Sequence, residues 1–370
     1  MRLLICAGGT GGGVYPALAV FEALSAEHPG VETLWVGGEG GMEAELVKRE
    51  HIPFRSIPAA GLHGVGLRAL PRNLVQLTRG AFAARRMIRD FRPDVLFFTG
   101  GYVAGPIAFA ARVPAPAGSR IPTLLYVPDI EPGLALKSLA VFADRIAVSA
   151  EESQQYFRKK VVVTGYPLRG ELLKWTRTSG REALGLNDEL PVVLVMGGSK
   201  GARSINQAVV ANLPALLRMA QVIHITGQLD WETVQKSTEA LTEVERQRYH
   251  AFPYLHETMG AALAAADLVV ARAGASTLGE LPVNGLPAVL IPYPHAWRYQ
   301  MVNADHLAQR GAAIILADEL LPQELLRVVT DLLENPSKRR AMEAAMRSLR
   351  QPEAAQAIAD QLIELGGKRP

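Results

Sequence analysis

The chain has 370 residues, enough for two domains, and is 49% hydrophobic, 20% charged and 6% aromatic, which excludes a disordered or fibrous protein. The formal net charge of +3 is too small to suggest a nucleic-acid-binding protein, and the excess of basic residues falls in the first half. Cys6 is the single cysteine, so an intramolecular disulfide and a cysteine-based zinc site are excluded, and the cytosol is the expected compartment. No apolar run approaches a signal-peptide core or the roughly 18 residues of a membrane span, so we expect neither a secreted nor a transmembrane protein.

Short apolar runs rich in β-branched residues alternate with helix-length segments, which is the pattern of an α/β protein with parallel sheets. In the first half the predicted strands are Arg2–Ala7, Thr33–Val36, Val95–Phe98, Thr123–Tyr126, Arg145–Ser149 and Val161–Thr164. In the second half they are Val192–Met196, Val222–Thr226, Leu268–Ala271, Ala288–Ile291 and Ala312–Leu316. We therefore predict two doubly wound domains, residues 1–168 and 169–350, with a final helix at about 352–365 that can pack back on the first domain.

A glycine-rich turn follows the first strand of each half, at Gly8–Gly12 and at Gly197–Gly201. Such a turn lets a ligand approach the backbone, and the N–H groups of the next helix favour an anion such as phosphate. Sites in doubly wound sheets lie beyond the carboxyl ends of the strands, so two facing domains would enclose a ligand cleft. The alternative for each motif is a tight turn with no ligand.

Several ligand classes are disfavoured by missing residues. The first turn lacks the last glycine of the dinucleotide fingerprint, because Val14 or Pro16 stands there, and the chain has no P-loop. His256-Glu257 begins like a zinc-protease motif, but Gly260 replaces the second histidine. We therefore expect no metal and no cofactor.

The sequence Gly197-x-Ser199-x-Gly201 also resembles the nucleophile elbow of a serine hydrolase, with Asp267 and His295 following in the right chain order. Lys200 and Arg203 beside Ser199 suit phosphate instead, and the hydrolase hypothesis leaves the first glycine turn without a purpose. We rank the hydrolase below a nucleotide-sugar-binding protein.

The segment Gly274–Glu280 predicts another helix start, with Ser276 or Thr277 as the cap and Glu280 about one turn in. A capped helix with no ligand is one interpretation. The other places the N–H groups of Ala275 to Thr277 on a diphosphate and Glu280 on a ribose diol.

Five blocks resemble, in order, the signature blocks of the MurG family of bacterial glycosyltransferases. They are Ala7–Gly12, Gly100–Pro106, Gly197–Arg203, Gly274–Glu280 and Arg298–Ala304. The resemblance covers nearly the whole chain and implies a GT-B fold, in which two doubly wound parallel-sheet domains face a cleft. It also implies metal-independent, inverting transfer of N-acetylglucosamine from its UDP ester to undecaprenyl-pyrophosphoryl-N-acetylmuramoyl-pentapeptide (lipid I), giving lipid II for the peptidoglycan cell wall.

The resemblance implies a donor site mainly in the C-terminal domain. Arg169 and Ser199 would contact the diphosphate, and the His256 backbone would read the uracil edge. Glu280 would hold the ribose, and Gln300 and Asn303 the sugar. The phosphates and ribose would be lined by Ala275, Ser276, Thr277, Leu278 and Gly279, and the N-terminal domain would contribute Thr10, Gly11 and Gly12.

The departures from the family lie on the acceptor side. Gly13 stands where the family has a histidine proposed as general base, Tyr126-Val127-Pro128-Asp129 stands in place of His-Glu-Gln-Asn, and Tyr299 replaces the first of two paired glutamines. A base is needed to deprotonate the acceptor hydroxyl. We choose Asp129, which occupies the family's asparagine position; Glu131 and His63 are the alternatives.

A predicted helix begun near Pro71 carries two faces. Leu70, Leu74, Leu77, Ala81 and Ile88 form the expected core stripe, and Arg72, Val75, Arg79, Phe82 and Arg86 form a basic face with apolar residues interleaved. A solvated face is the alternative to an anionic membrane surface. Because a polyprenyl-linked acceptor is confined to the bilayer, we favour a cytoplasmic protein bound peripherally to the inner face of the cell membrane.

Two other functions stay open. One is a related UDP-sugar transferase with a different lipid or small acceptor. The other is a protein that binds a nucleotide-sugar without catalysis, which the glycine at position 13 makes conceivable.

Overall fold

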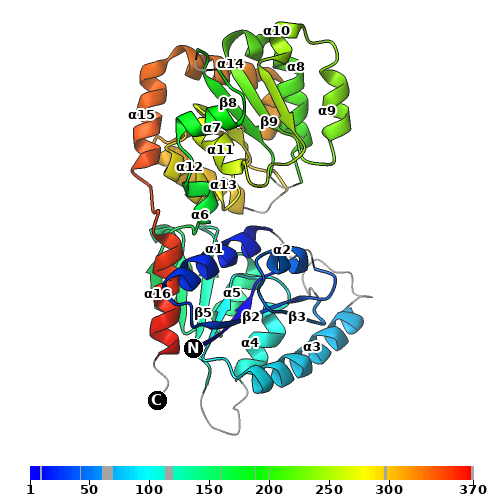
Figure 1. Cartoon of the computed structure of the whole chain (residues 1–370), viewed down its shortest axis with the longest axis vertical. Helices are drawn as coiled ribbons and strands as arrows, with labels where there is room; N and C mark the ends of the chain where they lie inside the picture. The colour runs from blue at the N-terminus through cyan, green and yellow to red at the C-terminus, as the bar shows by residue number, and fades with distance from the viewer. Residues whose placement is uncertain are drawn as a thin grey trace. The chain divides into compact units, whose positions relative to one another are not determined.

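The computed structural model describes residues 1–8, 11–41, 43–60, 70–112, 120–158, 160–187, 189–198, 200–295 and 298–367. The chain divides into two compact units (Figure 1). Unit 1 comprises Met1–Arg169 and the segment from Glu353 onward, and unit 2 comprises Gly170–Pro352.

Each unit is built on one parallel sheet. The strands of unit 1 have the order β3-β2-β1-β4-β5-β6-β7, and those of unit 2 the order β10-β9-β8-β11-β12-β13. Strand order therefore reverses between β1 and β4 and between β8 and β11, and ligands of doubly wound sheets bind at such switch points. The predicted doubly wound α/β architecture is confirmed for each unit.

The elements of unit 1 are β1 (Arg2–Cys6), α1 (Gly11–Glu27), β2 (Glu32–Gly38), α2 (Glu43–Arg49), β3 (Phe54–Ile57), α3 (Leu70–Phe91), β4 (Val95–Phe98), α4 (Ala104–Arg112), β5 (Thr123–Val127), α5 (Leu134–Ala140), β6 (Arg145–Val148), η1 (Glu151–Tyr156), β7 (Val161–Val163) and α16 (Ala354–Gly366).

The elements of unit 2 are α6 (Gly170–Leu173), α7 (Arg177–Ala183), β8 (Val192–Met196), α8 (Arg203–Met219), β9 (Gln221–Ile225), α9 (Trp231–Ser237), α10 (Glu243–Arg246), β10 (Tyr249–Phe252), α11 (Met259–Ala265), β11 (Leu268–Ala271), α12 (Thr277–Asn284), β12 (Ala288–Leu290), α13 (Tyr299–Gln309), β13 (Ala313–Ile315), η2 (Asp318–Leu320), α14 (Leu321–Glu334) and α15 (Pro336–Arg347).

Every predicted strand is present with its ends within two residues of the predicted ones, and two further strands were missed. β3 and β10 are outer strands of their sheets. Only Ile57 of β3 is buried, and β10 is half-buried throughout. Arg55 and Ser56 interrupt β3 and His250 interrupts β10, so these two strands lack the continuous apolar run by which buried parallel strands are recognised. The other outer strands, β7 and β13, keep such a run and were predicted.

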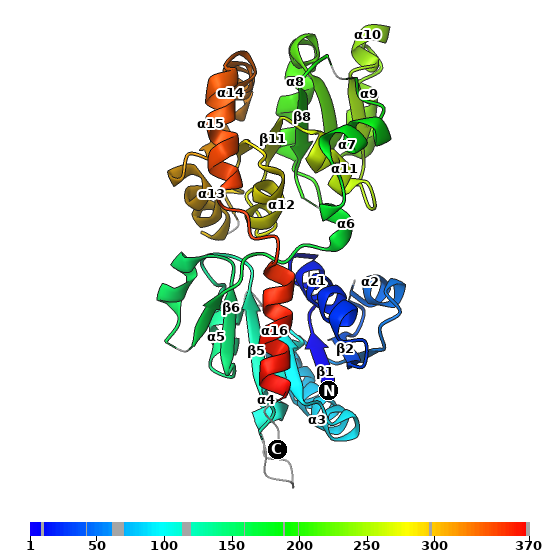
Figure 2. The same ribbon diagram turned by 60° about the vertical axis from the view of Figure 1, so that its left-hand side comes forward.

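The last helix, α16, packs on α1, β4 and β5 of unit 1 (Figures 1 and 2). Its buried face includes Ile358 and Leu362. The Arg145 side chain is 4% exposed and donates to both carboxylate oxygens of Glu364, at 2.5 and 3.0 Å. This two-pronged contact to a planar carboxylate fixes α16 against the start of β6.

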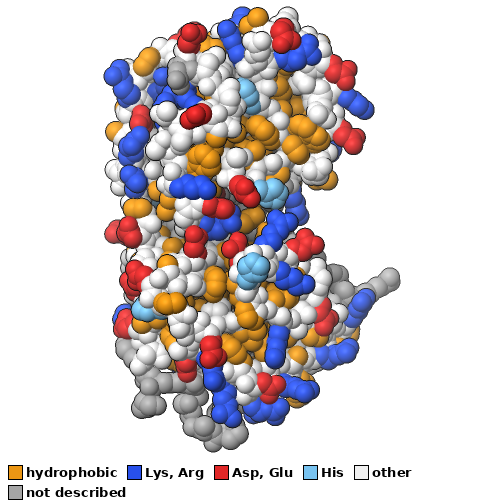
Figure 3. Space-filling model, viewed as in Figure 1, with side chains coloured by type: hydrophobic (Ala, Val, Ile, Leu, Met, Phe, Trp, Pro, Cys, Tyr) orange, Lys and Arg blue, Asp and Glu red, His pale blue; other side chains and the backbone are white. Residues whose placement is uncertain are grey.

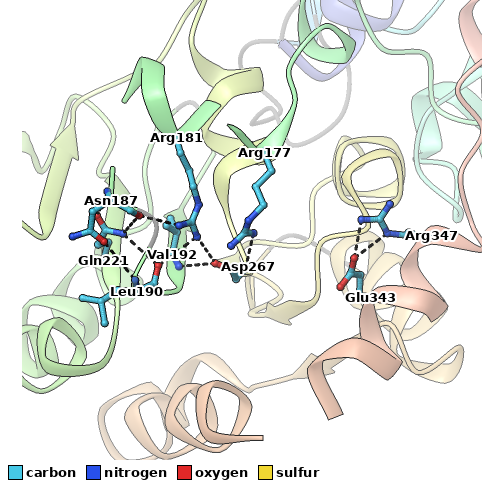
Figure 4. A network of polar contacts seen from close by, with 9 residues as sticks. All are labelled: Arg177, Arg181, Asn187, Leu190, Val192, Gln221, Asp267, Glu343 and Arg347. Carbon is cyan, nitrogen blue, oxygen red and sulfur yellow. Dashed lines mark hydrogen bonds and ion pairs between the residues drawn. The ribbon is translucent and has the colours of Figure 1, made fainter. Parts of the chain in front are cut away.

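A polar network joins the amino ends of the central strands in unit 2 (Figure 4). The Asp267 carboxylate, just before β11, accepts from the Val192 N–H at 2.8 Å and from Arg181 Nη2 at 2.9 Å, and it lies 2.6 Å from Arg177 Nη1. Asp267 is therefore a structural ion-pair partner at the amino edge of the sheet.

This position overturns the serine-hydrolase alternative. Ser199 follows β8, whereas Asp267 is bound at the first residue of β8. At about 3.3 Å per residue, the five-residue strand separates the two edges by roughly 16 Å. A triad acid must instead bond its histidine directly.

Candidate active site

The loops after β8 and β9 meet at two glycines. Gly201 and Gly227 both have φ of +78°. A Cβ on Gly201 would lie 2.2 Å from the Thr226 carbonyl oxygen, and a Cβ on Gly227 would lie 2.4 Å from the Gly201 Cα. Only glycine satisfies both this left-handed conformation and this close backbone approach, so the two loops form one turn at the carboxyl edge of the sheet, in which Gly227 is buried and Gly201 half-buried.

A buried polar network supports this turn from behind. Asn206, on the second turn of α8, donates to the Thr226 carbonyl at 2.8 Å and to Asp230 Oδ2 at 3.0 Å. Its Oδ1 lies 3.0 Å from His224 Nε2, while His224 Nδ1 lies 2.8 Å from the Tyr249 hydroxyl. Asp230 also binds Arg203 Nε at 3.0 Å. The network ties α8, β9 and β10 to the glycine turn.

Burial of His224 leads to a stability prediction. The side chain is fully buried, and desolvation lowers the pKa of His224 to about 4. Between that value and the unfolded pKa of about 6.5, the unfolded chain binds a proton that the folded chain does not. We therefore expect the free energy of unfolding of unit 2 to fall as pH drops from 6.5 to 4, by up to about 3 kcal/mol from this group.

Urea unfolding of the parent and of His224→Gln at pH 7.5, 6 and 5 measures this effect. The variant should lose less stability than the parent as pH falls, and His295→Gln, which removes an exposed histidine from the same unit, should follow the parent. Burial also lowers the pKa of His250, but that group is present in all three proteins and cancels in the comparison. Parallel pH dependences for parent and His224→Gln would contradict the prediction.

The first turn of α12 contains Glu280, the residue predicted to bind the ribose. Ser276 occupies the cap position, but its side chain does not cap the helix; the hydroxyl lies 3.1 Å from Glu280 Oε2 and donates to it. The Thr277 hydroxyl donates to the Gly274 carbonyl at 2.6 Å. The Ser276 contact holds one carboxylate oxygen of the half-buried Glu280 and so orients the group, as a site for a ribose diol would require.

Gln300 and Asn303, the residues predicted to bind the sugar, lie on α13. The Gln300 Oε1 accepts from the Tyr293 N–H at 2.8 Å. Asn303 is fully buried and donates to the Ala273 carbonyl at 3.2 Å, which ties α13 to the loop before α12. His256 is exposed after β10, with the Tyr254 ring packed edge-on at 4.6 Å.

In unit 1 the first turn of α1 contains Gly11, Gly12 and the buried Gly13. The Thr99 hydroxyl donates to the Gly13 carbonyl at 2.8 Å, and a Cβ on Gly13 would lie 3.3 Å from that hydroxyl oxygen. Gly101 has φ of +87°, and its Cβ would lie 2.6 Å from the Gly8 carbonyl oxygen. The loops after β1 and β4 therefore touch through their backbones at the switch point of the sheet.

Asp129 follows β5 and is half-buried. The preceding Pro128 carbonyl accepts from the Ser149 hydroxyl at 2.7 Å, and the Tyr126 hydroxyl lies 2.8 Å from the same Ser149 oxygen. Burial, and then the nearby negative charge of Asp129, raise the pKa of Tyr126 well above its usual range, while the Ser149 hydrogen bond opposes the rise. Tyr126 and Ser149 thus fix the backbone from which Asp129 projects.

Glu131, the alternative base, forms an ion pair with Lys137. Its Oε1 lies 3.6 Å from Lys137 Nζ, and its side chain is 12% exposed. The ion pair ties one carboxylate oxygen of Glu131 to Lys137 on α5.

Arg169 is the last residue of unit 1, and its guanidinium lies over the Tyr15 ring of α1, with Cζ 4.9 Å from the ring centroid. A Cβ on Gly11 would meet the same ring at 3.2 Å. Tyr15 therefore holds Arg169, the residue predicted to contact the diphosphate, next to the first glycine turn.

Three predicted site residues, Thr10, His63 and Ser199, lie outside the described residues. Sequence reasoning overlooked Glu43, which is 1% exposed and accepts from the Gly38 N–H at 2.8 Å. A Cβ on Gly8 would lie 2.5 Å from its carboxylate. The glycines around Glu43 in the sequence were the available signal, because they leave room for a buried side chain.

The predicted core stripe of α3 is partly wrong. Leu74 is 58% exposed, and the buried positions are Gly80, Ala84 and Met87. A Cβ on Gly80 would lie 2.2 Å from the Pro58 carbonyl oxygen, so close approach at a glycine decides which face of the helix turns inward. The predicted basic face, with Arg72, Val75, Arg79, Phe82 and Arg86, is exposed throughout, and Figure 3 shows basic and hydrophobic side chains interleaved over α3.

No described helix is long and apolar enough to cross a bilayer. Among the described residues, no cluster of three or more His, Cys, Asp or Glu side chains has the arrangement of a metal site.

Comparison with known proteins supports the resemblance on both units. Residues 3–148 match the glycosyltransferase family 28 N-terminal domain, and residues 192–362 match the C-terminal domain of that family. Two similar proteins are both named UDP-N-acetylglucosamine–N-acetylmuramyl-(pentapeptide) pyrophosphoryl-undecaprenol N-acetylglucosamine transferase. The one from Roseiflexus sp. is 42% identical, covering 97% of this chain and 94% of that protein; the one from Desulforudis audaxviator is 40% identical, covering 100% and 99%.

Solved structures agree with these matches. The crystal structure of Acinetobacter baumannii MurG aligns with a TM-score of 0.76 at 29% identity, covering 98% of this chain and 99% of that one. A UDP-GlcNAc 2-epimerase from Neisseria meningitidis, at 14% identity and a TM-score of 0.67 over 98% of this chain and 100% of that one, shares the fold alone. The fold is GT-B, and the chain belongs to glycosyltransferase family 28 and, within it, to the MurG family.

Proposed function

We propose that this protein transfers N-acetylglucosamine from UDP-N-acetylglucosamine to undecaprenyl-pyrophosphoryl-N-acetylmuramoyl-pentapeptide, forming lipid II for peptidoglycan synthesis. The names of the relatives that match it over nearly their full length support both substrates. The structural observation that carries the proposal is the carboxyl edge of the unit 2 sheet. There the glycine turn at Gly201 and Gly227, the start of α12 and the oriented Glu280 carboxylate suit a nucleoside diphosphate.

In the proposed reaction, a base removes the proton of the acceptor hydroxyl as its oxygen bonds to C1 of N-acetylglucosamine. The bond from C1 to the diphosphate breaks, its electron pair leaves with UDP, and the configuration at C1 inverts. Asp129 takes the proton, while Arg169 and the helix starts stabilise the charge that develops on the diphosphate.

Release of UDP tests the proposal. The protein should release UDP only when both UDP-N-acetylglucosamine and the lipid-linked acceptor are present, and other UDP-sugars and acceptors should be poorer substrates. A protein that binds UDP but releases none with any acceptor would be a binding protein. Release with a different acceptor alone would show a related transferase.

Gly13, which stands in place of the family's histidine, is the feature that favours the alternative of a transferase with a different acceptor. The residue is buried in the first turn of α1, where a side chain has little space beside Thr99. Loss of the family's histidine at this position changes the acceptor side and leaves the donor site as it is, as a transferase with a different acceptor would require.

We further propose that α3 binds an anionic membrane surface on the cytoplasmic side. Phe82 is 77% exposed and Val75 57% exposed, between arginines that are also exposed. Exposed apolar side chains can enter the interface, and each nearby arginine contributes about 1 kcal/mol with anionic lipids. A lipid-linked acceptor would reach the protein at this surface.

Replacing Arg72, Arg79 and Arg86 with Gln should reduce sedimentation with anionic vesicles while UDP affinity stays unchanged. Salt should weaken vesicle binding of the parent, because screening at 0.15 M acts over about 8 Å. A matched control replaces Arg327, Arg340 and Arg350, which removes the same charge from exposed positions of unit 2. Equal loss in both triple variants would show a general charge effect with no role for α3.

A further inference from the structure

A cluster around Arg272 joins four segments at the carboxyl edge of the unit 2 sheet. Arg272, just after β11, is 10% exposed. Its guanidinium donates to the Ile291 carbonyl at 3.1 Å and to the Ser204 hydroxyl at 2.8 Å, and it forms an ion pair with Asp318. The Ser204 hydroxyl in turn donates to Asp318 at 2.8 Å. The planar guanidinium therefore has fixed partners on α8, the end of β12 and η2.

The same guanidinium supports the segment after β12. Its Cζ lies 5.2 Å from the centroid of the Tyr293 ring, two residues beyond the Ile291 carbonyl that it also binds. The Tyr293 ring is 45% exposed, so the guanidinium holds a ring that burial alone does not fix.

Tyr293 sets the chemistry that Gln300 can offer. Its N–H donates to Gln300 Oε1, so the oxygen of that carboxamide faces the backbone. The other end of the carboxamide is an amino group, which carries two donors and accepts nothing. Gln300 therefore presents donors, and a group that it binds must accept: a hydroxyl oxygen or an amide carbonyl oxygen, both of which an N-acetylated sugar carries.

We propose that Arg272 and Tyr293 are positioning residues for the sugar of the donor, acting through Gln300. The inference rests on the proposed function, because it assumes that Gln300 meets the sugar of a UDP-sugar. It predicts that Tyr293 affects recognition of the sugar and leaves recognition of the nucleotide unchanged.

The test compares the affinities of the whole protein for UDP and for UDP-N-acetylglucosamine by calorimetry. Tyr293→Leu keeps the backbone N–H but removes the aromatic ring, so UDP-N-acetylglucosamine should bind about three- to tenfold more weakly while UDP binding stays the same. Tyr293→Phe keeps the ring and should match the parent. Arg272→Lys keeps the charge but loses the planar fork, and should behave like Tyr293→Leu; Arg327→Gln, from an exposed ion pair on α14, is its control.

Gln300→Glu tests whether Tyr293 acts on the sugar through Gln300. A glutamate still accepts from the Tyr293 N–H but has no donors, so sugar-dependent affinity should fall. In that background Tyr293→Leu should add no further loss, because two residues that act through one contact are not additive.

The outcomes separate the inference from the function. A parent protein without affinity for UDP or its sugar ester would refute the proposed function, and the inference with it. If the parent binds both ligands, three results would overturn the inference alone. Tyr293→Leu could weaken UDP and UDP-N-acetylglucosamine equally, it could weaken neither, or its loss could add to that of Gln300→Glu in the double variant.

Discussion

Asp129→Asn should lower turnover by roughly 10²- to 10⁴-fold, the usual contribution of a general base, and leave the affinity for UDP nearly unchanged. Asparagine preserves the size of the side chain and removes the charge that takes the proton. Because Ser149 fixes the preceding Pro128 carbonyl, the substitution should not displace the loop. The measurement is UDP release at saturating donor and acceptor, with calorimetry for UDP.

The matched control is Glu131→Gln, which removes a carboxylate two residues further along. Glu131 Oε1 forms an ion pair with Lys137, and we expect turnover to stay within a fewfold of the parent. Full turnover in Asp129→Asn, together with loss in Glu131→Gln or His63→Ala, would assign the proton to another group. Higher turnover in Gly13→His would show that the parent lacks an efficient base, although the added side chain must displace Thr99, which lies 3.3 Å from the position of the new Cβ.

Glu280→Ala should weaken UDP binding by about 1–3 kcal/mol, roughly five- to 150-fold, since hydrogen bonds to a charged group have this magnitude. The loss should shrink when 2′-deoxy-UDP replaces UDP, because the carboxylate then has fewer hydroxyls to bind in the parent. Ser276→Ala should produce a smaller loss, since it frees the orientation of Glu280 without removing its charge.

Arg169→Ala should also weaken UDP binding by about 1–3 kcal/mol, but through the diphosphate. Its effect should therefore disappear with uridine, which carries no phosphate, whereas the effect of Glu280→Ala should persist. Unchanged UDP affinity in both variants would remove the basis for the donor site.

Most of the strands and glycine turns could be predicted from the sequence, because central parallel strands are continuous apolar runs and a positive φ favours glycine. The edge strands β3 and β10 were missed because their half-exposed residues carry no such run. The inward face of α3 was misjudged because apolar periodicity marks both faces, and the deciding feature was a backbone approach at Gly80.

Partners distant in sequence could not be predicted. Arg272 and Asp318 are 46 positions apart, and Asn206 and His224 are 18 apart, so nothing local marks either pair. Asp267 was different, because it directly precedes a predicted strand and therefore belongs to the amino edge. That signal was present in the sequence and would have excluded the hydrolase at once.

The docking of α16 on unit 1 has a consequence for the order in which the chain is made. Unit 2 is contiguous, whereas unit 1 lacks α16 until residues 354–366 have been synthesised. At about 5–20 residues per second, the surface of β4 and β5 that α16 covers waits about 10–40 s while some 200 further residues are synthesised. Unit 1 is thus completed after unit 2, and a fragment cut after Arg169 would keep that apolar surface exposed.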